Sequence, residues 1–157
     1  MSRLLSTILM TMFLAACIPL TPAPVEAPLA TPGVPVQANW TIRFTQSGGI
    51  MGMMREMEIT SDGNLKVTDD RTGKTVTGQL TAGELAQLST LMGGLAYDRP
   101  SGPTSCADCF NYTVVIASDT GKTFTAQADD TTLEASGLSP LADYLRTLME
   151  NALKTQG

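Results

Sequence analysis

The chain has no histidine among its 157 residues. Histidine is the commonest general base and the commonest zinc ligand in proteins, and it activates the nucleophile in Ser-His and Cys-His dyads. Its absence disfavours most hydrolytic and zinc-dependent enzymes. Carboxylates and lysines are still present, yet we expect a protein that is not an enzyme and that needs no cofactor or metal.

Basic residues are also scarce. Ten Lys and Arg face 15 Asp and Glu, which gives a formal net charge of −5. Binding to nucleic acid depends on neutralising phosphates, and adsorption to anionic lipid depends on clustered Lys and Arg. We therefore expect no nucleic-acid partner, and we expect any attachment to a membrane to come from something other than charge.

Long apolar runs are absent except near the N-terminus. There Arg3 precedes an apolar segment of about ten residues that ends in Leu14-Ala15-Ala16-Cys17. A basic start, a short apolar segment and small residues before the cut are typical of an export signal. The segment is too short to span a bilayer, which takes roughly 20 residues.

The position of Cys17 directly after Leu-Ala-Ala resembles the lipobox of bacterial lipoproteins. The resemblance implies that residues 1–16 are a signal peptide, that Cys17 becomes a diacylglycerol thioether, and that its new amine is acylated with a chain such as palmitate. Several acyl chains on one residue anchor a protein stably. We expect an extracytoplasmic protein of the cell envelope, held to the outer membrane or the cell surface by its lipid. The alternative is an ordinary secretory signal with a chance cysteine.

A proline-rich tether follows the lipobox. Prolines recur every few residues from Ile18 to Gln37, and Glu26 carries the one charge. Such a composition favours an extended, partly polyproline-II spacer without a core. We therefore divide the chain into the signal peptide, a lipidated Cys and tether over 17–38, and one domain over 39–157, which is long enough for a single core.

The domain begins with strand-like patterns. Trp40, Ile42 and Phe44 alternate with polar residues, as in a half-buried strand. Similar alternation predicts further strands, which centre on Met57, Leu65, Val76, Val114 and Ala126. The strand that starts at Phe110 is apolar on both faces, which predicts a central strand covered on both sides.

Two helices interrupt and close this series. Thr81 and Glu84 form a capping box ahead of leucines at helical spacing, and Gly93-Gly94 ends that pattern. Ser139 followed by Pro140 predicts an N-cap and a first helical proline for the second helix. Strands packed against helices in this order give an α+β fold, with an antiparallel sheet of about five to six strands and two helices on one side.

The first candidate site is a glycine-rich segment in the first hairpin. It consists of Ser47, Gly48, Gly49, Ile50, Met51 and Gly52. Glycine permits positive φ and lets a partner's backbone approach closely, and the two apolar residues would then form a partner-binding tip. The alternative is a plain hairpin turn or bulge.

The cysteine pair, the methionine cluster and two acidic pairs are weaker candidates, because each has a structural explanation. Cys106 and Cys109 are expected to form a small structural disulfide, because a redox CxxC normally opens a helix and a zinc site would need a second pair of ligands. Met51, Met53 and Met57 are soft ligands that could hold Cu(I), but methionine also fills gaps in cores. The pairs Asp69-Asp70 and Asp129-Asp130 are expected to be solvated turn residues.

The domain resembles the emfourin family of protein inhibitors of thermolysin-like metallopeptidases such as protealysin. The likeness covers most of residues 39–153. Its first strand and glycine turn are matched by Ile42, Phe44, Ser47, Gly48, Gly49 and Gly52. Its leucine-rich helix, Asp-x-Phe-x-Tyr strand and closing helix are matched by Leu85–Leu95, Asp108, Phe110, Tyr112, Val114, Leu141, Leu145 and Leu148.

The resemblance implies a function. An inhibitor of this kind occupies the cleft of an exported metallopeptidase with rigid loops and contributes no metal ligand, in keeping with the lack of histidine. Ile50-Met51 stands where the family often has Phe-Ala, and the cysteine pair and lipid anchor are additions. The alternative is an accessory envelope lipoprotein that binds peptide, glycan or another envelope protein and inhibits nothing.

Mass spectrometry of the mature protein tests the anchor. We predict that its N-terminal peptide begins at Cys17 and carries a diacylglycerol thioether on the sulfur with an acylated amine. An unmodified Cys17 in protein recovered from the soluble cell interior would contradict this prediction.

Overall fold

The computed structural model describes residues 39–100 and 106–155. The signal peptide, Cys17 and the tether lie outside these residues and remain predictions. Within the described part of the chain, no helix is long and apolar enough to cross a membrane. The elements, in chain order, are β1 (Trp40–Gly48), β2 (Met53–Thr60), β3 (Asn64–Asp69), β4 (Lys74–Gln79), α1 (Ala82–Gly93), β5 (Phe110–Ser118), β6 (Thr123–Asp129) and α2 (Ser139–Thr155).

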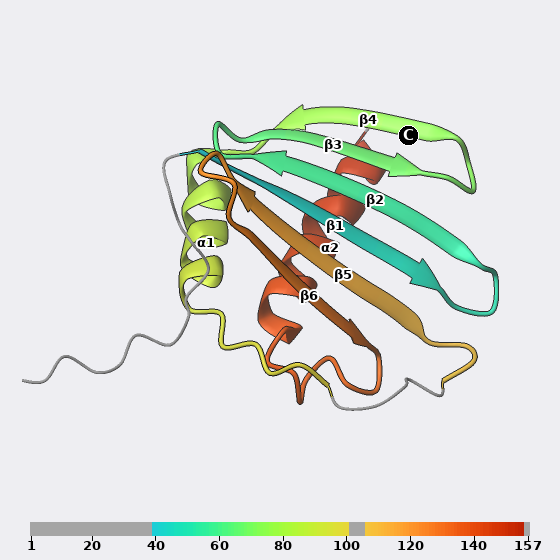
Figure 1. The fold of residues 1–157 in the computed structure, drawn as a ribbon. Helices are drawn as coiled ribbons and strands as arrows, with labels where there is room; N and C mark the ends of the chain where they lie inside the picture. Colours follow the sequence, from blue (N-terminus) through green and yellow to red (C-terminus); the bar gives the residue numbers. More distant parts are fainter. Residues whose placement is uncertain (1–38, 101–105, 156–157) are drawn as a thin grey trace, which may run out of the picture.

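The strands form one open antiparallel sheet in the order β4-β3-β2-β1-β5-β6. Both helices lie against the same face of this sheet, with α2 running behind its middle (Figure 1). The predicted α+β class, with two helices on one side of an antiparallel sheet, is confirmed. The long jump from α1 to β5 places β5 beside β1, so the first strand of the domain lies inside the sheet.

The core lies between the sheet and the helices. Ile42 is paired with Ile59 on one neighbouring strand and with Ile116 on the other, and all three are fully buried. Leu88 of α1 and Leu145 of α2 close over this face. Every residue of the main core falls between residues 40 and 149. The described domain therefore contains its own core.

The opposite face of the sheet is open and rich in threonine. Its polar side chains include Thr41, Thr45, Thr60, Thr68, Thr75, Thr77, Thr113, Thr123 and Thr125. The prediction that β5 is covered on both sides is wrong. β5 is flanked by β1 and β6, but Val115 and Ala117 lie on the open face and are half-buried by neighbouring strands alone.

The two helix starts differ in how well the sequence locates them. The Thr81 hydroxyl accepts from the Glu84 amide at 3.2 Å, and the Thr81 amide donates to the Glu84 carboxylate at 2.8 Å, so the capping box is confirmed. The predicted cap at Ser139 is wrong by one residue. Ser139 is already helical, and its hydroxyl donates to Asp143 instead.

The expectation that both acidic pairs are solvated is wrong for the first member of each pair. Asp69 is buried and accepts from Arg55 Nε at 2.9 Å, while Asp129 is buried and accepts from the amides and hydroxyls of Thr131 and Thr132. Asp70 and Asp130 are exposed, as expected. The buried carboxylates hold the chain where it leaves β3 and β6.

The Arg55–Asp69 pair predicts a pH dependence of stability. Burial by itself would raise the pKa of Asp69, but hydrogen bonds from Arg55 and from the amides of Thr72 and Arg71 outweigh it and lower the pKa below its ordinary value of 3.8. Because the folded-state pKa is the lower one, this stabilisation is complete above pH 3.8 and is lost as the pH falls through the folded-state value.

We therefore expect Asp69→Asn to lower the free energy of unfolding by about 1–2 kcal/mol at pH 7. The difference in unfolding free energy from the unmodified protein should shrink as the pH falls below 3.8. Urea unfolding of both proteins at pH 7 and at a pH below 3.8 measures this change. Asp70→Asn is the matched control, because Asp70 is exposed, and it should cost less than about 0.5 kcal/mol.

Candidate binding site at the β1–β2 turn

Exposed large apolar side chains gather at one corner of the described domain. They are Ile50, Met51 and Met54, which are 86%, 66% and 40% exposed. All three belong to the β1–β2 turn or to the start of β2. Single exposed apolar residues are ordinary, whereas several together are a candidate contact surface. We call Ile50, Met51 and Met54 the apolar tip.

The turn beneath the apolar tip is pinned to β5. The Gly49 amide donates to the Cys109 carbonyl at 3.1 Å. Gly48 has φ +107°, and a Cβ added there would lie 2.4 Å from that same carbonyl oxygen. At Gly49, with φ +70°, a Cβ would lie 2.9 Å from the Phe110 ring. The sequence predicts that a partner's backbone approaches these glycines; in the structure the backbone that lies against them is this chain's own, at Cys109.

A disulfide and a carboxylate fix the segment that supports the turn. Cys106 is bonded to Cys109 just before β5. The Asp130 carboxylate then accepts from the Phe110 amide at 2.8 Å and from the Tyr112 hydroxyl at 2.7 Å. Burial, followed by this bond to Asp130, raises the pKa of Tyr112 to about 12, so the phenol stays protonated as a donor. Asp130 carries no sequence signal for this role.

A second turn lies beside the apolar tip. Arg71, in the β3–β4 turn, donates from Nη1 to the Met51 sulfur at 3.4 Å. The neighbouring Asp70 amide donates to the Met54 carbonyl at 3.1 Å. Figure 1 shows the β1–β2 turn, the β3–β4 turn and the chain entering β5 at the same end of the sheet. These three segments form one rim around the tip.

The methionines do not assemble as the copper hypothesis requires. Met57 lies in the core, paired with Phe44 and Val67 and 1% exposed, whereas Met51 lies in the exposed turn. Met53 shares a strand face with Met57 but is four residues away, about 13 Å along a strand. Among the described residues there is also no group of three or more His, Cys, Asp or Glu that could hold a metal.

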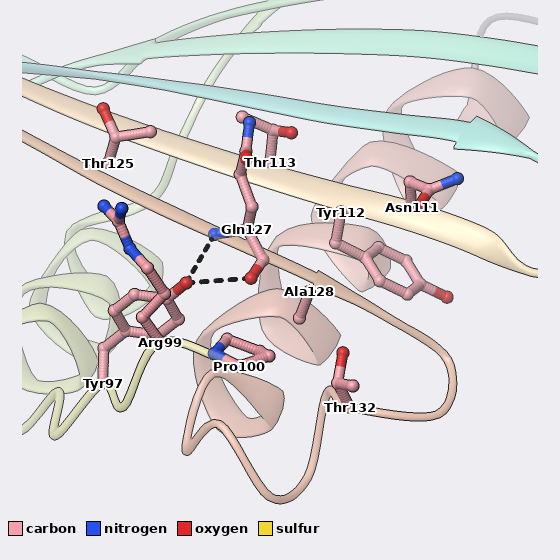
Figure 2. A pocket seen from close by; sticks show the side chains of 10 residues that line it. All are labelled: Tyr97, Arg99, Pro100, Asn111, Tyr112, Thr113, Thr125, Gln127, Ala128 and Thr132. Carbon is pink, nitrogen blue, oxygen red and sulfur yellow. Dashed lines mark hydrogen bonds between the residues drawn. The ribbon is translucent and has the colours of Figure 1, made fainter. Parts of the chain in front are cut away.

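A polar groove of about 450 Å³ lies elsewhere, at the β6 edge of the sheet. The Tyr97 hydroxyl both donates to the Gln127 carbonyl at 2.9 Å and accepts from its amide at 3.0 Å, as Figure 2 shows. The Tyr97 ring also meets Phe124 edge-on at 5.8 Å. The other side chains around the groove include Arg99, Asn111, Thr113, Thr125 and Thr132. Sequence reasoning missed this groove, because Tyr97 stands in a stretch without periodicity.

No protein-family model matches the chain, and no curated protein matches it. The resemblance to emfourins therefore rests on the quoted motifs. In the structure two of those motifs meet at the corner described here, since the Ser-Gly-Gly turn lies against the start of the Asp-x-Phe-x-Tyr strand at Gly49 and Phe110.

The glycines of the turn differ in what a side chain would cost. Alanine at Gly48 combines an unfavourable φ with a clash against a backbone oxygen, whereas alanine at Gly52 brings only the φ of +57° and meets no atom within 4 Å. We expect Gly48→Ala to lower the free energy of unfolding by about 3 kcal/mol and Gly52→Ala by about 1 kcal/mol. Urea unfolding of the two variants measures both, and equal costs would contradict the close approach.

Gly49→Val is a poor probe of binding alone. Valine would place its Cβ against the Phe110 ring at a φ that β-branched residues avoid, so the substitution would perturb the fold as well as any binding. Substitutions at Ile50 and Met51 are cleaner, because both side chains are exposed.

Proposed function

We propose that this chain is an envelope-anchored binding module that inserts its β1–β2 turn into the cleft of an exported thermolysin-like metallopeptidase and inhibits it. The observation that carries the proposal is the apolar tip on a turn that Gly48 and Gly49 pin to β5. The class of partner rests on the resemblance to emfourins.

A pinned turn suits this task because ordering a loop on binding costs free energy. Each side chain immobilised at an interface costs about 0.5–1.5 kcal/mol, and pre-organised loops avoid much of that cost. Here the Gly49–Cys109 hydrogen bond and the nearby disulfide hold the backbone before any partner arrives. The turn can then exclude substrate by occupying a cleft, without chemistry of its own.

The lipid and tether give the module a place to act. A lipid on Cys17 and an extended segment from Ile18 to Gln37 would hold the domain at the membrane surface. At about 3.1 Å per residue, this spacer reaches on the order of 60 Å. The module would therefore restrain peptidases that come near the envelope.

A second candidate function is favoured by the groove at the β6 edge. Hydroxyls, an amide and the Arg99 guanidinium surround it, which suits a polar ligand such as a glycan or peptide of the envelope. In that case the protein is an accessory lipoprotein that inhibits nothing. Arg99→Ala would weaken ligand capture from membranes, and changes at the apolar tip would not.

Inhibition assays separate the two functions. We expect a soluble fragment of residues 38–157, which contains the whole domain, to inhibit at least one of several thermolysin-like peptidases at micromolar concentration. Ile50→Ser and Met51→Ser should each weaken inhibition about tenfold or more, because burying such a side chain stabilises a complex by about 1.5–3 kcal/mol. Their unfolding curves should match that of the unmodified domain, since neither side chain contributes to the core.

Lys122→Ala is the matched control. Lys122 is exposed in the β5–β6 turn, which lies at the other end of β5 from the apolar tip, and its loss should leave inhibition unchanged. Absence of inhibition across the whole panel of peptidases would overturn the proposal.

A further inference from the structure

Five of the six methionines of the described domain fall into two classes of accessibility, and the sixth, Met53, is half-buried. Met51 is 66% exposed and Met54 is 40% exposed, both at the apolar tip. Met57, Met92 and Met149 lie in the core and are at most 1% exposed. Methionine in a contact surface is open to oxidants from solvent, whereas buried methionine is shielded. The sequence alone shows a cluster of methionines but not this division.

We propose that Met51, together with Met54, is a reversible oxidation site that switches off binding by the apolar tip. The oxidant is a peroxide, such as hydrogen peroxide. The site of modification is independent of any partner, while the effect on binding rests on the proposed function.

The reaction is a two-electron oxygen transfer. A sulfur lone pair of the thioether attacks one peroxide oxygen, the O–O bond breaks, and an S–O bond forms. The departing hydroxide takes the remaining proton and leaves as water, so that the sulfur is oxidised and the peroxide is reduced. Methionine sulfoxide reductases reverse the change, converting two thiols into a disulfide and releasing water.

The position of Arg71 suits the oxidised state as well as the reduced one. Its Nη1 lies 3.4 Å from the Met51 sulfur, which is a weak acceptor. A sulfoxide oxygen on that sulfur is a much stronger acceptor and would lie next to the same guanidinium. The Arg71 guanidinium would thus donate a hydrogen bond to the sulfoxide and hold the oxidised side chain beside the β3–β4 turn. The polar sulfoxide would then stand where binding needs an apolar contact.

Oxidation at the apolar tip leaves the fold intact while changing the contact surface. Met51 and Met54 are not among the core residues, so a polar group on either sulfur enters no buried space. The same change converts a flexible apolar side chain into a polar, chiral one. A partner's apolar pocket would then have to desolvate a sulfoxide.

Peptide mapping by mass spectrometry tests the site itself. The full chain, purified in detergent, is exposed to graded hydrogen peroxide and digested. We expect Met51 and Met54 to convert to sulfoxide at least about tenfold faster than Met57, Met92 and Met149, with an unchanged circular dichroism spectrum. Met53 is half-buried and should fall between the two groups. Conversion of all methionines at similar rates in protein that remains folded would overturn the proposal.

Inhibition by the oxidised chain tests the switch. Peroxide should raise the inhibition constant against a susceptible peptidase about tenfold, equivalent to about 1.4 kcal/mol. Treatment with two sulfoxide reductases, one for each epimer of the sulfoxide, should restore the original constant. The variant with Met51→Leu and Met54→Leu keeps apolar side chains of similar volume, so its inhibition should not respond to peroxide. Equal losses in both proteins would overturn the switch.

Two controls keep the readouts separate. An unoxidised sample is taken through the reductase step as well. The thiols that drive the reductases can also reduce the Cys106–Cys109 disulfide, and this sample measures that effect alone. If the untreated chain inhibits no peptidase, the proposed function fails, and peptide mapping still decides whether the oxidation site exists.

Discussion

The close approach of the β1–β2 turn to the start of β5 is the contact on which the position of the apolar tip depends. One hydrogen bond, from the Gly49 amide to the Cys109 carbonyl, joins the two segments across some 60 residues of sequence. It exists because neither Gly48 nor Gly49 has a Cβ to keep the backbones apart. The turn therefore has a supported position, and the apolar side chains at its tip project from a fixed base.

The same end of the sheet holds two carboxylates whose hydrogen bonds order the adjoining loops. Asp69 accepts from Arg55 and from two backbone amides, and Asp130 accepts from the Phe110 amide and the Tyr112 hydroxyl. The hydrogen bonds that buried Asp69 receives offset the cost of its burial, whereas Asp130 is exposed. Each of these carboxylates also fixes the chain next to the apolar tip.

The open face of the sheet differs from the apolar tip in being polar. It is covered with threonines and with exposed charges such as the Arg43–Glu58 pair, which water solvates well. Exposed apolar area is concentrated at the rim of the sheet instead. Under the proposed function, the apolar tip would enter a cleft, whereas the broad polar face would need an equally broad polar partner.

The sequence by itself determined the α+β class, the strands of the sheet, the capping box of α1 and the glycine turn, because alternation, helical spacing and capping are local properties of neighbouring residues. It did not show that Asp69 is buried and Asp70 exposed, and it did not reveal the hydrogen bonds that Asp130 accepts or the groove beside Tyr97. Those features arise when strands distant in sequence pair, as β1 does with β5. Which side chain of a neighbouring pair is buried depends on that pairing, and only the tertiary structure decides it.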